Sequence, residues 1–207
     1  MASKVFAVIA GFIVSTIGAL GYTGVAVLMA IESACVPLPS EIILPFAGYL
    51  VFMGKLKLLS VAVAGALGCV VGSVAAYAAG VYGGRPLIER YGRYILISRH
   101  DLDLADRLFN RFGTMIVFTG RLLPVVRTFI SLPAGISRMN FTKFVIYTFV
   151  GSFIWSLLIA WIGFKLGEKW QVIGPYFHRF DDVLFVSAIL LFIVYLIRHL
   201  RQVSSEA

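Results

Sequence analysis

Long apolar stretches constrain the fold of this chain more than any other feature. Residues 5–31 form a run of about 27 residues without a charge, and similar stretches cover residues 58–82, 141–164 and, more briefly, 183–197. A helix needs about 20 mostly apolar residues to cross a bilayer. The first run is also too long for the apolar region of a signal peptide, which has about 7–15 residues. The four stretches therefore predict four membrane-spanning helices.

The composition supports this prediction and excludes several other classes of protein. Hydrophobic residues make up 60% of the 207 residues and charged residues only 14%, which argues against a soluble globular enzyme. The net charge is +8, but the basic residues are scattered between apolar stretches, so anionic lipid fits them better than nucleic acid does. The three histidines are far apart in sequence, and we expect neither a metal site nor a cofactor.

Two further apolar stretches, residues 32–54 and 113–137, contain ionisable residues together with prolines and glycines. Broken backbone is tolerated at membrane depth only where it is buried in protein or lines a wet cavity. We therefore expect two re-entrant helical hairpins, each entering and leaving the membrane on one side. The residues expected to shape them are Pro37, Pro39, Gly48, Pro124, Pro133 and Gly135.

These segments predict a single all-α integral membrane domain over residues 1–207. Its first half is 1–82 with the hairpin 32–54, and its second half is 113–165 with the hairpin 113–137. The polar connector 83–112 predicts an amphipathic surface helix through Leu104, Leu108 and Phe112. A final transmembrane helix is expected over residues 182–200.

The basic residues outside the hydrocarbon predict the orientation. With four spans and two hairpins, eleven of them fall on one side and five on the other, which places both termini in the cytoplasm. The hairpins then enter from opposite sides, as in the inverted repeats of many transporters. An offset of 87 residues aligns Pro37 with Pro124, and it also aligns Ala47-Gly48 with Ala134-Gly135.

Four charged residues fall at membrane depth on these hairpins: Glu32, Glu41, Arg121 and Arg127. Each costs about 2.5–3.5 kcal/mol at the centre of a bilayer, so a function or a mutual ion-pair cluster must explain them. Arginine suits bidentate recognition of phosphate, and a carboxylate can carry a proton. Ser40 and Thr128 adjoin two of the four and can donate to a ligand oxygen, although helix capping is the commoner role.

The residues Gly120-Arg121-Leu122-Leu123-Pro124-Val125-Val126-Arg127, followed by Ala134-Gly135, Met139 and Phe144, resemble the signature of the DedA family, also called the VTT or SNARE-associated domain family. The earlier Glu32, Pro37-Leu38-Pro39-Ser40-Glu41 and Ala47-Gly48 resemble that family's first hairpin. The resemblance implies a bacterial cytoplasmic-membrane protein that moves lipids, including carriers of undecaprenyl phosphate or of phosphatidylethanolamine. It also implies that function depends on Glu32, Glu41, Arg121 and Arg127. Leu122, where many members have an aromatic residue, and Ser40, often glycine, depart from the pattern.

The resulting hypothesis is a flippase for a phosphate-bearing lipid, most notably undecaprenyl phosphate. Arg121, Arg127, Ser40 and Thr128 bind the phosphate, while Glu32 and Glu41 couple transport to protons. One alternative is a small proton or cation antiporter, in which the carboxylates carry the ion; others are a phospholipid transporter or scramblase and a non-catalytic scaffold. An enzyme is disfavoured because it would need a nucleophile and an acid or base positioned together, and the three histidines lie at predicted membrane edges or in loops. The sequence is compatible with a homo-oligomer and does not specify the oligomeric state.

Overall fold

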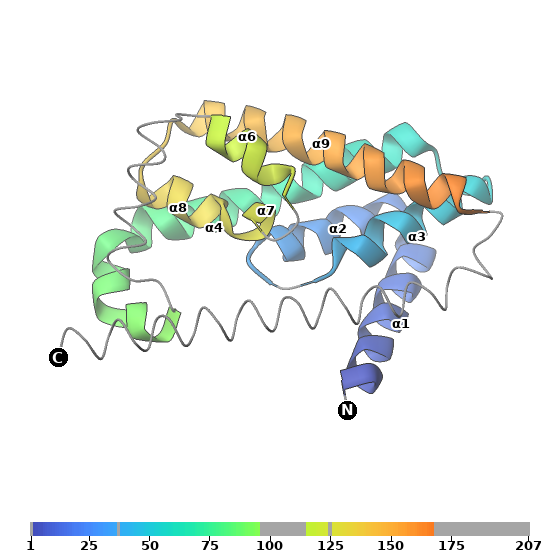
Figure 1. Ribbon diagram of the computed structural model, residues 1–207, viewed down its shortest axis with the longest axis horizontal. Helices are drawn as coiled ribbons and strands as arrows, with labels where there is room; N and C mark the ends of the chain where they lie inside the picture. The colour runs from blue at the N-terminus through green and yellow to red at the C-terminus, as the bar shows by residue number, and fades with distance from the viewer. Residues whose placement is uncertain (1, 37, 96–114, 124–125, 168–207) are drawn as a thin grey trace.

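All regular elements in the described part of the chain are helices, in agreement with the predicted all-α class (Figure 1). The computed structural model describes residues 2–36, 38–95, 115–123 and 126–167, with side chains from residue 10 onward except in residues 84–95. Within this part, the two helices long and apolar enough to cross a membrane are α4 (Leu58–Ile95), over Leu58–Gly83, and α9 (Phe141–Lys165). The expected surface helix through Leu104, Leu108 and Phe112 and the final helix 182–200 lie outside the described residues.

The prediction of one unbroken helix over residues 5–31 is wrong. The structure has two helices there, α1 (Ala2–Leu20) and α2 (Tyr22–Ser33), joined at Gly21, whose φ of 57° lies in the left-handed region. Gly24 of α2 packs so closely on the end of α1 that a Cβ at Gly24 would lie 2.7 Å from the carbonyl oxygen of Thr16. Glycine supplies both the unusual backbone conformation and the close approach, and α1 projects away from the other helices (Figure 1).

Two helical hairpins occupy the middle of the molecule. The first pairs α2 with α3 (Ser40–Phe52), so its first arm begins at Tyr22, ten residues before the predicted boundary. The second pairs α6 (Met115–Arg121) with α7 (Val126–Phe129) and α8 (Ser131–Ile136). Figure 1 shows the hairpins approaching from opposite ends of the long axis, with their tips near the centre. There the thiol of Cys35 donates to the carbonyl of Thr128 over 3.6 Å.

The packing of the two hairpins on the long helices is mirrored. In the first hairpin α2 packs on α4 and α3 on α9, whereas in the second α6 packs on α9 and α8 on α4. Gly48 of α3 lies against the backbone of α9 at Ala160 and Phe164, and Gly135 of α8 lies against the backbone of α4 at Tyr77. The offset of 87 residues that relates Gly48 to Gly135 also relates Tyr77 to Phe164.

Both hairpins also end in the same way. After α3, Gly54 has a φ of 71° and Lys55 donates its N–H to the carbonyl of Leu50; after α8, Arg138 has a φ of 49° and Met139 donates to Ala134. These are Schellman motifs, in which a left-handed residue lets the chain turn while satisfying the last carbonyls of the helix. Each turn leads within a few residues into a long helix, α4 or α9.

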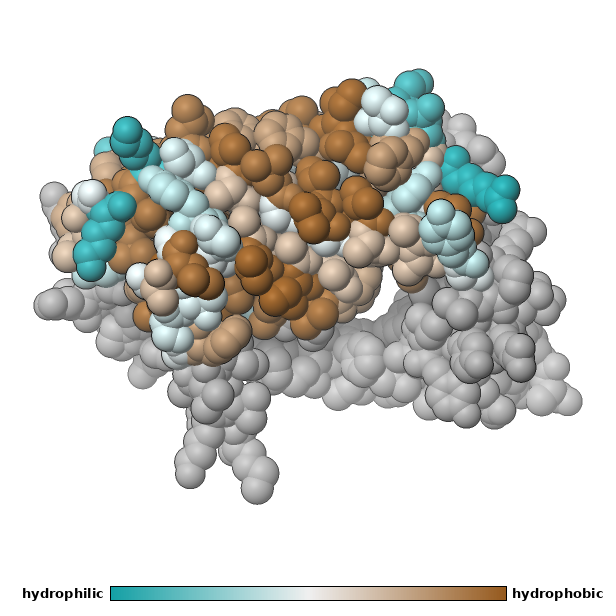
Figure 2. Space-filling model, turned by 180° about the vertical axis from the view of Figure 1, so that it is seen from behind, coloured by the Kyte–Doolittle hydropathy of each residue, from teal (hydrophilic) through white to brown (hydrophobic). Residues whose placement is uncertain are grey.

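The apolar surface forms a band between two polar ends. Figure 2 shows hydrophobic residues across the middle of the coloured face and hydrophilic residues at its two extremities. Exposed Lys55, Lys57 and Lys165 belong to the end where α3 meets α4 and α9 finishes, while exposed Arg138 and Lys143 belong to the end where α8 meets α9. The 25 residues of α9 span about 37 Å, enough to cross a hydrocarbon core of about 30 Å.

Candidate functional site

A buried ion pair joins the tips of the two hairpins. Nη2 of Arg127, in α7, donates to Oε2 of Glu32 over 2.9 Å, and the two side chains are only 2% and 5% exposed. Glu32 lies one residue before the end of α2, where the carbonyl end of the helix dipole disfavours a negative charge. The positive charge of Arg127 therefore offsets the unfavourable position of the Glu32 carboxylate at the end of α2.

One nitrogen of the Arg127 guanidinium forms no hydrogen bond to the described residues. Nη1 is buried and has no hydrogen-bond partner in the described part of the chain, while Nη2 also contacts the sulfur of Cys69 at 3.8 Å. One face of the guanidinium lies over the ring of Trp155, with Cζ 5.3 Å from the ring centroid. The arginine is thus held by a carboxylate and an aromatic ring and keeps a free donor for an anion.

Arg121, the last residue of α6, is bound differently. It is 1% exposed; Nη1 donates to the carbonyl of Arg127 over 2.8 Å, and Nη2 donates to the hydroxyls of Ser73 and Ser131, each over 2.6 Å. Its Nε has no partner. All three acceptors are neutral, and among the described residues no carboxylate pairs with this guanidinium. A buried cation without a counterion favours the approach of an anion.

The structure thus brings the two arginines together across the break in the second hairpin, although six residues separate them. On one continuous helix they would lie about 240° apart around the axis. Here α6 ends at Arg121 and α7 begins at Val126, so the side chain of Arg121 reaches the backbone of Arg127. The side chains then diverge, Arg127 toward Glu32 and Arg121 toward Ser73.

The other expected ligand residues lie close to this pair. Ser40 is the first residue of α3 and is fully buried, and its hydroxyl lies beside the carboxylate of Glu32. It makes no capping bond, because Pro39 holds the N-cap position. Glu41 is half-buried and close enough to Glu32 for the carboxylates to interact. Glu41 forms no salt bridge with Arg121 or Arg127. Thr128 is buried in α7.

The prolines and glycines expected to shape the hairpins have distinct places. Pro39 precedes α3, and Pro133 lies in α8, where it removes the N–H that would bond to Phe129. Gly48 and Gly135 lie inside helices rather than in turns, where they permit the close contacts with α9 and α4. Pro37 and Pro124 lie outside the described residues.

Four side chains of the site were missed by reasoning from the sequence: Cys69, Ser73, Ser131 and Trp155. Three of them lie on α4 and α9, which the sequence identifies only as apolar spans. Small hydroxyls and a tryptophan are common in such helices, so no local signal distinguishes those that meet an arginine. Their partners are 28 to 58 residues away in sequence or, for Ser131, across the hairpin break.

Comparison with known proteins identifies the family. Residues 38–165 match the family model described as the VTT domain. The chain belongs to the VTT domain family. The resemblance inferred from the DedA signature is therefore confirmed, and the match contains both arginines, whereas Glu32 lies just before it.

Three relatives match nearly the whole chain. The uncharacterized membrane protein YkoX of Bacillus subtilis is 38% identical over 88% of this chain and 81% of its own length. Undecaprenyl phosphate transporter A of the same organism is 35% identical over 86% of this chain and 88% of its own length. Undecaprenyl phosphate transporter A of Staphylococcus aureus is 28% identical over 90% of this chain and 94% of its own length. No solved structure matches the chain.

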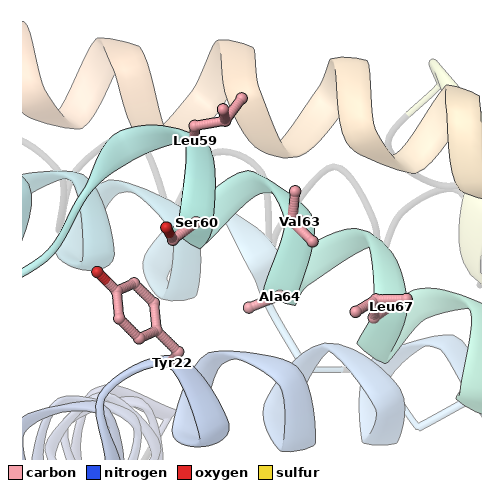
Figure 3. Close-up of a pocket in the computed structure, with 6 residues that line it drawn as sticks. All are labelled: Tyr22, Leu59, Ser60, Val63, Ala64 and Leu67. Atoms are coloured by element: carbon pink, nitrogen blue, oxygen red, sulfur yellow. The ribbon is translucent and has the colours of Figure 1, made fainter.

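A surface groove of this VTT-family chain is separate from the charged cluster. It has a volume of about 380 Å³ and lies between α2 and α4, where Figure 3 shows Tyr22 pointing toward Ser60. Val63, Ala64 and Leu67 of α4 also line it. The lining is mostly apolar, and the hydroxyl of Tyr22 accepts a hydrogen bond from the N–H of Lys57. Tyr22 begins α2 and Glu32 is near its end, about 15 Å farther along the helix.

Proposed function

We propose that this protein is a membrane transporter that moves a phosphate-bearing lipid, undecaprenyl phosphate above all, across the bacterial cytoplasmic membrane. The observation that carries the proposal is the buried pair Arg127–Glu32 at the meeting of the hairpin tips, with Nη1 of Arg127 unpartnered. Two relatives that cover most of the chain are named as undecaprenyl phosphate transporters, which supports this choice of lipid.

The phosphate competes with Glu32 for Arg127. A guanidinium can offer two parallel N–H donors to two phosphate oxygens, and Nη1 is already free. When the phosphate also takes Nη2, Glu32 loses its only salt-bridge partner among the described residues. An unpaired carboxylate in a buried site favours its neutral form, so Glu32 binds a proton as the lipid binds. This exchange couples lipid movement to the proton gradient, and Glu41, close to Glu32, shares in it.

The remaining ligand residues surround the same point. Arg121 supplies a second positive charge that no carboxylate of the described residues balances, and Ser40 supplies a hydroxyl beside Glu32. Thr128 follows Arg127 directly. Together they neutralise and solvate a head group that would otherwise be very costly to place in hydrocarbon, while the prenyl or acyl tail stays in the lipid.

We further propose that the two hairpins are re-entrant and form an inverted repeat about the site. The first enters from the outside and the second from the cytoplasm, with both termini cytoplasmic. The mirrored packing on α4 and α9, the paired glycines and the two Schellman turns support equivalent halves of opposite orientation. Such an arrangement allows the site at the tips to open to either side in turn.

Transport into liposomes tests the proposal. Purified protein is reconstituted, and the rate at which undecaprenyl phosphate becomes accessible on the opposite leaflet is measured with and without a pH gradient. The same measurement is made with phosphatidylethanolamine as the alternative substrate. Arg127→Lys keeps a positive charge near Glu32 but removes the second donor of the guanidinium, so we expect transport to fall at least tenfold. Arg138→Lys, the same change at an exposed site, should leave the rate unchanged.

Two results would contradict the proposal. If Arg127→Lys transports undecaprenyl phosphate at the parental rate, the guanidinium of Arg127 does not bind the phosphate as proposed. Proton or cation movement by the parent protein without any lipid movement would instead support the antiporter alternative, in which Glu32 and Glu41 carry the ion.

A further inference from the structure

Three hydroxyl side chains form a row on the buried face of α9. Thr148, Ser152 and Ser156 are spaced four residues apart, so they lie one above another on the same side of the helix. Their exposed fractions are 0%, 3% and 0%. We refer to these three residues as the hydroxyl row; from first to last it rises about 12 Å along α9.

The two outer hydroxyls of the row lack hydrogen-bond partners. Among the residues that the structure describes, Thr148 Oγ1 and Ser156 Oγ are buried and have no hydrogen-bond partner, and neither has Nε1 of Trp155 beside them. A helical hydroxyl can normally donate to the carbonyl four residues earlier. Thr16 does so to Phe12 over 2.7 Å and Thr119 does so to Met115 over 3.0 Å. Because an unpaired buried donor is unfavourable, donors left free on one face of one helix point to a ligand.

The hydroxyl row passes both arginines of the site. Gly151, between its first two members, lies against the side chain of Arg121, and Trp155, next to its last member, lies under the guanidinium of Arg127. Ser156 packs against Gly65 of α4, where a Cβ would lie 2.8 Å from the hydroxyl and 3.5 Å from Leu44 of α3. The row thus runs from the second hairpin to the first.

Close packing alone does not account for the row. Where α9 needs room for a neighbouring backbone it carries Ala160 and Gly163, which contact α3 at Gly48 and Pro45. Alanine at position 156 and valine at position 148 would fill the same space without a buried polar atom. The hydroxyls themselves therefore require an explanation.

We propose that the hydroxyl row is the track along which the phosphate head group moves between the two hairpins. The inference rests on the proposed function and adds α9 to the substrate path. Each hydroxyl donates to a phosphate oxygen while the arginines balance the charge, so the head group keeps donors on one side throughout the passage. The row is closed in this structure, with Ser156 against Gly65 of α4, so α4 and the hairpins must move away from this face of α9 to admit the head group.

The test combines transport, binding and thermal stability of the double variant Thr148→Val/Ser156→Ala. We expect the rate of undecaprenyl phosphate transport in liposomes to fall at least tenfold, while its equilibrium affinity, which Arg127 dominates, changes less than threefold. The melting temperature should stay equal or rise, because two unpaired polar groups are replaced by apolar ones of similar shape. The matched control Thr142→Val/Ser15→Ala makes the same changes at exposed positions and should leave transport unchanged.

The outcomes separate the track from the proposed function. If the parent protein moves undecaprenyl phosphate and the double variant moves it equally fast, the track is wrong and the proposed function stands. If the double variant loses transport together with thermal stability, the row is structural and the track is again wrong. If the parent protein neither binds nor moves undecaprenyl phosphate, the proposed function is wrong and the track falls with it.

Discussion

At the scale of single residues, the contact between Arg127 and Glu32 links two segments that are 95 residues apart in the sequence. Both groups are almost completely buried. A buried ion pair adds little net stability compared with apolar residues, yet losing one partner leaves the other charge uncompensated. This asymmetry makes the pair suitable for an exchange in which an anionic ligand takes the place of the carboxylate.

A double-mutant cycle tests this coupling. Arg127→Gln and Glu32→Gln each remove one charge, and we expect Arg127→Gln to lower the free energy of unfolding by about 3–5 kcal/mol because Glu32 is left unpaired. The double variant should lose clearly less than the sum of the two single changes. Reversible unfolding in detergent measures all three, with Arg138→Gln, an exposed change expected within about 0.5 kcal/mol of the parent, as the control. Additive effects would show that the two side chains are not coupled.

At the scale of helices, the hairpins are positioned by glycine contacts with the long helices. Gly48 meets the backbone of α9, and Gly135 meets that of α4. The sequence singled out both residues through their shared offset but predicted that they shape turns. In the structure they shape helix–helix contacts, and this could not be read from the sequence because the facing helix is unknown until the chain packs. Gly21 was expected inside a continuous helix, but it lies between α1 and α2. Nothing in an apolar run distinguishes a glycine that ends a helix from one that continues it.

Alanine at these glycines provides the corresponding test. A Cβ at Gly48 or Gly135 overlaps the backbone of the facing helix, which a flexible side chain cannot relieve. Overpacking of this kind costs about 1–3 kcal/mol, so we expect the melting temperature to fall in each variant. Gly18→Ala on α1 is the matched control: a Cβ there has open space, and alanine favours a helix by about 1 kcal/mol over glycine. Equal melting temperatures for Gly48→Ala and Gly18→Ala would contradict the close contact.

At the scale of the whole molecule, the mirrored halves place two groups of basic residues at opposite ends of the apolar band (Figure 2). Lys55, Lys57 and Lys165 lie at one end, and Arg138 and Lys143 lie at the other. The mirrored packing could be anticipated only in outline. Offset identities suggested two related halves, whereas the exchange of partners between α4 and α9 depends on how the hairpins cross.

Cysteine labelling tests the proposed orientation. In a background with Cys35 and Cys69 replaced by alanine, Lys57→Cys should react with a membrane-impermeant maleimide added to intact cells. Lys143→Cys should react only after the membrane is permeabilised. The background without an introduced cysteine gives the level of nonspecific labelling. Labelling of both positions from the same side would contradict an arrangement in which α4 crosses the membrane and the second hairpin is re-entrant.

The sequence by itself determined the helical class, the two long apolar helices α4 and α9 and the VTT family, because these depend on local transfer free energies and local motifs. Only the tertiary structure decided that Arg127 pairs with Glu32 while Arg121 is held by Ser73 and Ser131. It alone also placed the hydroxyl row of α9 beside both arginines. The physical reason is that these contacts join segments far apart in the chain, and their geometry arises only when the hairpins pack against α4 and α9.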